Sequence, residues 1–281
     1  MGLFNRERIA GKTLEQLAGM RVAGLLVGQT LALLADTVRP GMTTLELDTL
    51  AETHIRDHGG APKFQLVPGY RHTLCTSVNE EIVHGIPGDR VLQEGDLLSI
   101  DCGAQVGQWN GDAAFSCIVG GREAGRPEDL ALIDDTEASL WAGIAALRVG
   151  SPLYAVGAAV EDSLAAAGER AGREYGIVED YVGHGIGSSV HMDPQVPDHR
   201  VSGKGPTVPE GLTIAIEPMV TLGAQDNHVL ADEWTVSTDD GSRAAHWEHS
   251  VAVTSAGIPV LTALDGGEAR LRALCAPFAA L

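Results

Sequence analysis

The sequence predicts an α+β fold built from two related halves that pack against each other. Stretches with apolar residues at helical spacing alternate with short β-prone runs. A second observation is that short glycine-containing segments recur in the same order in both halves of the chain. The length of 281 residues is sufficient for a sizeable core, whether in one large domain or in two small ones.

Two capped helices open the first half. Capping boxes at Thr13 and Thr43, each with Gln or Glu three residues later, predict where the helices start. The first helix is expected to extend to about Pro40, and the second to end at Gly59 and the glycine after it. These two helices precede the strand-rich part of the first half.

The second half begins with further helical spacing. It covers residues 128–147, is broken by Gly150-Ser151-Pro152, and continues to about Gly172. The last residues, 266–281, are rich in Ala, Leu and Arg and predict a short terminal helix or tail. We therefore place the two halves at about 10–125 and 126–265.

A predicted hairpin in the first half carries two aspartates. Polar and apolar residues alternate over 97–106, and 113–119 is a second β-prone run. If the chain reverses around Val106 and the glycine after it, Asp101 lies opposite Asp112 on one face. Two carboxylates at one place repel each other strongly unless a cation lies between them, so this arrangement predicts a metal.

The hairpin has a competing register. Asn110-Gly111 is itself a strong turn signal, which would pair Asp112 with Trp109 and leave Asp101 remote. We interpret Asn110-Gly111 as a bulge instead, because the second half of the chain supplies complementary side chains.

The internal repeat relates particular segments of the two halves. His84-Gly85-Ile86-Pro87 is matched by His184-Gly185-Ile186-Gly187, and a Glu-Gly pair precedes Asp101 at the spacing at which another precedes Glu217. Each match alone is weak, but their shared order supports a duplicated α/β unit. Such a duplication would bring one acidic strand from each half to the interface, where sites commonly form.

The second half adds further candidate ligands. His184 lies between two glycines, Glu217 follows the apolar run 212–216, and Glu248 precedes another β-prone run. A carboxylate so close to a buried strand requires a partner. His84 and His184, each followed by glycine, are equally compatible with turn positions. The candidate ligands are four carboxylates and one imidazole: Asp101, Asp112, His184, Glu217 and Glu248.

This donor set predicts two divalent cations. Four negative charges balance two such ions, and an oxygen-rich shell with one nitrogen suits Mn, Fe, Co or Zn. Metals about 3.5–4 Å apart can hold a bridging water and activate it for attack on a carbonyl. The sequence lacks the HExxH and G-x-S-x-G motifs, which excludes the common single-zinc protease and serine-hydrolase interpretations.

Composition limits the class of protein further. The formal net charge of −19 argues against non-specific nucleic-acid binding, which requires a basic surface. The four cysteines have no CxxC spacing, which indicates reduced thiols and a cytoplasmic setting. Residues 1–6 lack the pattern of a secretory or myristoylation signal. The apolar stretch 22–34 is too short and too mixed to span a membrane.

The chain resembles the type I methionine aminopeptidases of the creatinase or "pita-bread" fold, from about residue 10 to 265. The resemblance is carried by the motifs Ser77-Val78-Asn79-Glu80, His84-Gly85-Ile86-Pro87, Gly183-His184-Gly185-Ile186-Gly187, Pro194-Gln195-Val196, Ile216-Glu217-Pro218-Met219 and Glu248-His249. It implies a single catalytic domain over 1–281, with a curved antiparallel sheet covered by helices. It also implies removal of the initiator methionine when the second residue is small.

By the same resemblance, Asp112 and Glu248 would bridge the two metals, Asp101 would chelate one, and His184 with Glu217 the other. Glu217 would also act as the general base, a dual role for one carboxylate. The remaining catalytic residues, which would hydrogen-bond the substrate near the scissile amide, are His84 and His191. The free amine of the substrate would occupy a coordination position on one metal.

The resemblance further maps a methionine side-chain pocket onto Tyr70, Cys75 and Trp234. A thioether gains dispersion and sulfur–aromatic contact in such a pocket. Val67 and Val190 stand where relatives often have bulkier aromatic residues, which leaves the width of the pocket open. From the sequence alone, Tyr70 and Trp234 are equally compatible with ordinary core positions.

The family also implies partners and setting. We expect a cytoplasmic monomer that acts on Met-peptides and nascent polypeptides, without a specific nucleic acid or membrane, and association with the ribosome is an open hypothesis. Two alternatives remain. One is a proline-specific peptidase of the same fold, which usually carries an extra N-terminal domain. The other is a non-catalytic binding protein, which typically loses metal ligands, whereas none is lost here.

Overall fold

The computed structural model describes residues 9–281. The expectation about targeting signals in residues 1–6 therefore lies outside the described residues. Within 9–281 the chain forms the helices α1 (Leu14–Thr37), α2 (Thr44–Asp57), α3 (Pro127–Ala145), α4 (Ala155–Ala171) and α5 (Glu268–Ala273), and the short 3-10 helices η1 (Phe64–Leu66) and η2 (Arg122–Ala124).

The helix boundaries follow the local signals in the sequence. Both capping boxes are formed, since the side chains of Thr13 and Thr43 accept hydrogen bonds from backbone N–H groups three residues on. α4 ends where Gly172 takes a left-handed conformation with φ of 65°, which glycine adopts without steric cost. The terminal segment contains the short helix α5. The four long helices thus lie where the sequence predicted them.

The main sheet joins strands from both halves. Its strands are β1 (Ala61–Pro62), β2 (Leu74–Val78), β4 (Leu97–Val106), β5 (Trp109–Ile118), β7 (Gly183–Gly185), β8 (Met192–Val196), β9 (Leu212–Ile216) and β14 (Glu248–Val253). Their order is β1-β4-β5-β14-β9-β7-β8, with β2 also paired to β4, and every pairing is antiparallel. The β5–β14 pairing is the seam between the two halves.

Two three-stranded sheets complete the fold. Their strands are β3 (Glu81–Val83), β6 (Gly176–Ile177), β10 (Met219–Thr221), β11 (Asn227–Val229), β12 (Val236–Thr238) and β13 (Ala244–His246). One has the order β13-β10-β6, and the other has the order β11-β12-β3. Each therefore combines strands that lie far apart in the sequence.

The structure corrects the predicted hairpin register. The turn does follow Val106, but Asp101 pairs with Ala114 and Asp112 with Gly103, so the aspartates are offset by two residues. An offset of two keeps both side chains on one face. The predicted bulge at Asn110-Gly111 is wrong, because pairing is uninterrupted along the whole ladder.

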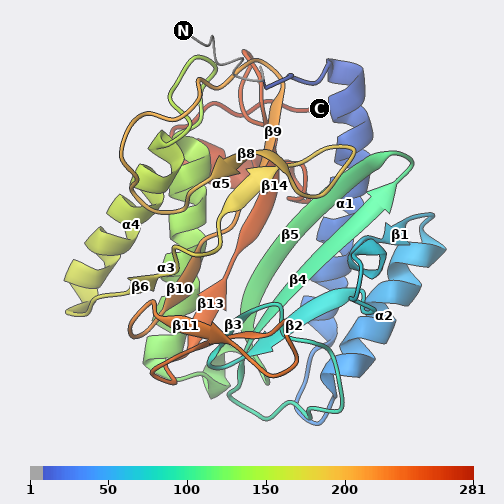
Figure 1. Ribbon diagram of the computed structural model, residues 1–281, viewed down its shortest axis with the longest axis vertical. Coiled ribbons are helices and arrows are strands. Elements are labelled where there is room, and N and C mark those ends of the chain that lie inside the picture. Colours follow the sequence, from blue (N-terminus) through green and yellow to red (C-terminus); the bar gives the residue numbers. More distant parts are fainter. Residues whose placement is uncertain (1–8) are drawn as a thin grey trace, which may run out of the picture.

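Helices cover one face of the sheet. In Figure 1 the α1–α2 pair lies to the right of the central strands and the α3–α4 pair to the left. α1 packs closely on β5, since a Cβ at Gly111 would lie only 2.7 Å from the Cα of Gly24. The whole of α1, unlike the stretch 22–34 considered above, is by length and composition alone long and apolar enough to cross a membrane. Its buried residues nevertheless pack against β4 and β5, as in the core helix of a globular protein.

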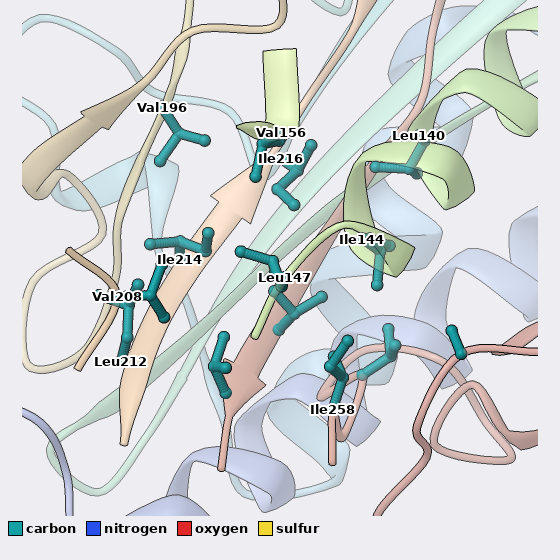
Figure 2. Packing of buried hydrophobic residues seen from close by; sticks show 14 of the residues in the cluster. Leu140, Ile144, Leu147, Val156, Val196, Val208, Leu212, Ile214, Ile216 and Ile258 are labelled. Atoms are coloured by element: carbon teal, nitrogen blue, oxygen red, sulfur yellow. The ribbon is translucent and has the colours of Figure 1, made fainter. Parts of the chain in front are cut away.

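The alternation of side chains along the strands separates the core from the opposite face. In Figure 2, Leu140 and Ile144 of α3 pack against Ile214 and Ile216 of β9. In the first half, Ile100 and its even-numbered neighbours on β4 enter the core under α1 and α2. Because successive strand residues point to opposite faces, Asp101 on β4 points away from the α1 and α2 side of the sheet.

Candidate metal centre

The five candidate ligands lie on five neighbouring strands. Across the sheet from β4 to β7, each strand or its end contributes one side chain, in the order Asp101, Asp112, Glu248, Glu217 and His184. Four of these side chains are acidic, and two of the strands belong to the first half and three to the second. The sheet therefore brings together residues that are separated by up to 147 positions (248 − 101) in the sequence.

Register places most of these residues at one level. Asp101 and Glu248 both pair with Ala114, on opposite sides of β5. Ile216 pairs with His249, so Glu217, the next residue, lies level with Glu248. Side chains at one level on one face of neighbouring strands are within contact range, which explains why the carboxylates gather at one place.

The ligand atoms lie within metal-binding range of one another. In each of three overlapping groups, one oxygen or nitrogen atom per residue lies within 4.8 Å of the others. The groups are Asp101–Asp112–Glu248, His184–Glu217–Glu248 and Asp112–His184–His191. Nε2 of His184 is 3.5 Å from Oε1 of Glu217 and 3.9 Å from Oδ2 of Asp112.

Several of the oxygens are buried without a hydrogen-bond donor. Within residues 9–281, no partner reaches Oδ1 of Asp101, Oδ1 of Asp112 or Oε1 of Glu248. An unpaired buried carboxylate oxygen costs several kcal/mol by order of magnitude, unless it meets a positive charge. These orphaned oxygens are what a cation site requires.

Burial also shifts the acidities of the carboxylates. Desolvation raises the pKa of Asp101 to about 7. It raises the pKa of Asp112 well above the usual range, and the nearby Asp101 raises it further. The pKa values of Glu217 and Glu248 are raised well above normal for the same reasons, burial first and neighbouring carboxylates second. The protein alone therefore does not stabilise the charged forms of these four carboxylates. Bound divalent cations would stabilise them.

His184 presents one nitrogen to the site. Its Nδ1 lies 3.0 Å from the backbone oxygen of Gly185, which accepts the Nδ1 proton. This hydrogen bond leaves the lone pair of Nε2 facing the carboxylates. Burial lowers the pKa of His184 to about 4, so the ring is neutral near pH 7 and able to bind a metal.

The other two predicted histidines lie beside the ligands. The ring centroid of His191 is 4.5 Å from that of His184, and one of its nitrogens belongs to a ligand group. His84 is in none of the three groups, and burial lowers its pKa to about 4, with the nearby His191 lowering it further. The His84 ring contacts Tyr181 edge-on at 5.5 Å between centroids.

An apolar cluster lies next to the ligands, where the methionine pocket was predicted. Tyr70 and Cys75 are buried and pack with Phe64, and the half-buried Trp234 covers them with its ring 5.0 Å from that of Tyr70. Cys75 pairs with Asp101 across β2 and β4. The three predicted pocket residues therefore meet in one cluster directly beside the carboxylates.

Some residues near the centre were not singled out from the sequence. Phe64 and Ile86 extend the apolar pocket, and Tyr181 packs on His84. Asp198 is buried, with an exposed fraction of 1%, and burial raises its pKa to about 7. No pattern in the sequence marks Asp198, because it follows a proline in a loop and its neighbours come from other strands.

The donor set and its surroundings fit divalent cations. Hard oxygen ligands with one neutral imidazole nitrogen match the preferences of Mn, Fe, Co and Zn, and the orphaned oxygens supply the unfilled coordination capacity. The fold and the site together define a metal-dependent protein with a pita-bread architecture, assembled from two halves around one centre.

Comparison with known proteins gives the family. The chain belongs to metallopeptidase family M24, whose model matches residues 18–255. Methionine aminopeptidase 1 of Mycobacterium tuberculosis is 46% identical over 261 residues, which is 92% of this chain and 97% of that protein.

Solved structures agree with this assignment. Methionine aminopeptidase from Thermotoga maritima superimposes with a TM-score of 0.85 at 35% identity, covering 91% of this chain and 100% of that one. Prolidase from Pyrococcus furiosus gives a TM-score of 0.69 at 19% identity and is covered to 65% of its length. The similarity to prolidase shows only that the two proteins share a fold.

Proposed function

We propose that this metallopeptidase is a methionine aminopeptidase, which removes the initiator methionine from peptides and nascent polypeptides with a small second residue. The single observation that carries the proposal is the gathering of five candidate metal-ligand side chains next to an apolar cluster of Tyr70, Cys75 and Trp234. The names of its relatives support the same activity. We further propose that the chain acts as one catalytic domain.

The metal ligands would divide between two cations. Asp112 and Glu248 lie in the middle of the group and would bridge them, Asp101 would complete one site, and His184 with Glu217 the other. When bound, divalent cations supply Lewis-acid stabilisation of developing negative charge and make water more acidic. We propose Co, Mn, Fe or Zn, two per chain.

Glu217 would be the general base. It lies at the end of β9, level with Glu248 and 3.5 Å from the His184 ring. Its carboxylate would accept a proton from the attacking water and pass it to the leaving amine. This role requires one carboxylate oxygen to remain free for the proton.

His84 and His191 would orient the substrate. Burial lowers the pKa of both rings, so each is neutral and able to donate one hydrogen bond while accepting another. Donation to the scissile carbonyl from the half-buried His84 or the more exposed His191 would stabilise the charge that develops on its oxygen. The contact of His84 with Tyr181 limits rotation of its ring.

The apolar pocket would select methionine. Its walls are aromatic rings and one thiol, and the hydroxyl of Tyr70 is occupied, since it donates to the backbone oxygen of Leu74 at 2.7 Å. A thioether therefore meets dispersion and sulfur–aromatic contacts without losing a hydrogen bond. Trp234, which is half-buried, would form the outer wall.

Release of methionine from Met-Ala-Ser tests the function. We expect cleavage of this peptide by Mn²⁺-loaded protein, no release from an N-acetylated copy, and no cleavage of Ala-Pro. Turnover of Ala-Pro with an intact Met-Ala-Ser would instead establish a proline-specific peptidase. Cleavage of neither peptide at full metal occupancy would establish a binding protein.

We also propose a cytoplasmic setting and a monomeric state. The four cysteines are free, as expected in a reducing compartment. Sedimentation of the purified protein would test the monomer, and co-sedimentation with ribosomes at physiological salt would test the hypothesis of association.

A further inference from the structure

The two halves hold their ligands in different ways. Asp101 and Asp112 lie inside a ladder with ten consecutive residue pairs, so the backbone on both sides of each ligand is fixed. His184 lies on the three-residue strand β7, whose register with β9 has a single pair, Gly185 with Ile214. Glu217 follows the last residue of β9 and is outside the strand.

Restraint on His184 is therefore uneven. On its C-terminal side, the hydroxyl of Thr213 donates to the backbone oxygen of Ile186 at 2.6 Å, and the Ile186 N–H donates to the Thr213 oxygen. On its N-terminal side the backbone N–H of Gly183 does not donate to β9. It donates to the side chain of Asp198 at 3.3 Å.

Asp198 contacts both ligand segments of this half. Its Oδ2 accepts a hydrogen bond from the backbone N–H of Gly183, directly before His184, and the carboxylate lies beside the backbone of Glu217. The side chain is buried, with an exposed fraction of 1%, and within residues 9–281 no hydrogen-bond donor reaches its Oδ1. One carboxylate thus lies against the backbone of both segments that carry the ligands proposed for the same metal.

The loop that carries Asp198 is itself fixed. The backbone oxygens of Pro197 and His199 lie against Gly157 of α4, where an added Cβ would be 2.4 Å and 2.2 Å from them. Only a glycine permits this approach, so α4 holds the loop at a set distance from the sheet. The backbone position of Asp198 is therefore set by the packing of its loop against α4.

We propose that Asp198 is a positioning residue, which aligns His184 and Glu217 so that their side chains bind one and the same metal. This inference rests on the proposed metal site and adds to it a residue that touches neither metal nor substrate. β7 pairs with β8 through Gly183 and His184, but it shares only one residue pair with β9, and the Asp198 carboxylate adds a contact between these two segments. Partners that orient metal ligands typically change metal affinity by about 10- to 100-fold when they are removed.

Titration of metal-free protein with Mn²⁺ tests the proposal without reference to catalysis. Calorimetry and electron paramagnetic resonance would follow the two binding steps in the parent, Asp198→Ala and Asp198→Asn. We expect Asp198→Ala to weaken one step by about 10-fold or more and leave the other unchanged. Asp198→Asn keeps an acceptor oxygen and should bind both ions within about threefold of the parent.

Asp129→Ala is the matched control. Asp129 is equally buried but pairs with Arg126 and Arg243, so its loss should lower the melting temperature and leave both Mn²⁺ affinities at parental values. Parental affinities in folded Asp198→Ala would overturn the proposal. Equal losses in Asp198→Asn and Asp198→Ala would also overturn it, because the charge and not the acceptor would then matter.

A further variant keeps the proposal testable if Asp198→Ala does not fold. If circular dichroism shows that Asp198→Ala is unfolded, Asp198→Ser replaces it, since its shorter side chain cannot reach both backbone segments. Weakening of one Mn²⁺ step in Asp198→Ser supports the proposal, and two parental steps overturn it. Because Mn²⁺ binding is measured directly, a parent that binds Mn²⁺ but releases no methionine would refute the function and leave this test intact.

Discussion

The two halves of the protein solve the same task by different means. The first half holds Asp101 and Asp112 within a long regular ladder packed on α1, while the second holds His184 on a three-residue strand and Glu217 just after the end of β9. A long ladder fixes a side chain through many backbone hydrogen bonds, whereas a short strand or a strand end depends more on individual side chains such as Asp198. The proposed general base, Glu217, therefore lies outside the regular ladders of the sheet.

The largest expected effect concerns Glu217 and its counterpart Asp101. Glu217→Gln should lower turnover of Met-Ala-Ser by roughly 10²- to 10⁴-fold, because the amide cannot accept the proton. Asp101→Asn removes a ligand but no base, so excess Mn²⁺ should restore part of its activity. Steady-state kinetics across a Mn²⁺ series would compare the two variants. Near-normal turnover by Glu217→Gln would refute its role as base.

Hydrogen exchange should report the difference in restraint directly. In metal-free protein, amides of β4 and β5 should exchange at least about 10-fold more slowly than those of β7 and of the residues around Glu217. Mn²⁺ should slow exchange mainly in the second group, because the ion adds the missing restraint. Mass spectrometry of peptides from both halves measures this ratio, and equal protection in the metal-free state would contradict the comparison.

Packing of α1 on the ladder should matter for stability. Gly111→Ala would place a methyl group 2.7 Å from the Cα of Gly24, so we expect a loss of about 1–3 kcal/mol in the free energy of unfolding. Gly88→Ala is the control, since its nearest neighbour would be 4.0 Å away. Urea unfolding of both variants provides the measurement. Similar stabilities would show that α1 does not fix the first half.

The smallest effect is the pH dependence of the metal-free protein. Burial raises the folded-state pKa of Asp101 to about 7 and those of the other site carboxylates further. Their contribution to stability is therefore present below the unfolded pKa near 4 and is lost as pH rises through the folded values. The melting temperature of chelated protein should fall between pH 6.5 and pH 7.5, and bound Mn²⁺ should remove this fall.

The histidines act in the opposite direction and at lower pH. Burial lowers the pKa of His84 and His184 to about 4, so their contribution is lost as pH falls below about 6.5 toward that value. The interval from pH 6.5 to 7.5 therefore reports mainly on the carboxylates. A melting temperature that rises across this interval would show that the site carboxylates are not destabilised by burial.

The sequence by itself determined the helices and the identity of the ligand types. Capping boxes at Thr13 and Thr43 and the glycine at 172 act over a few residues, so local patterns were sufficient to place those helix ends. The hairpin pattern and the internal repeat singled out the four acidic candidates from 38 acidic residues, and the resemblance to a family then gave each candidate its expected role.

Tertiary structure decided the rest. Asp101 and Asp112 lie on one face with an offset of two residues, because the ladder continues through Asn110-Gly111 where a local turn signal favoured a break. The position of Asp198 depends on β7, on the end of β9 and on α4. These segments are far apart in the sequence and meet only in the folded chain. Long-range register and loop packing depend on the whole chain at once, and no short stretch of sequence records them.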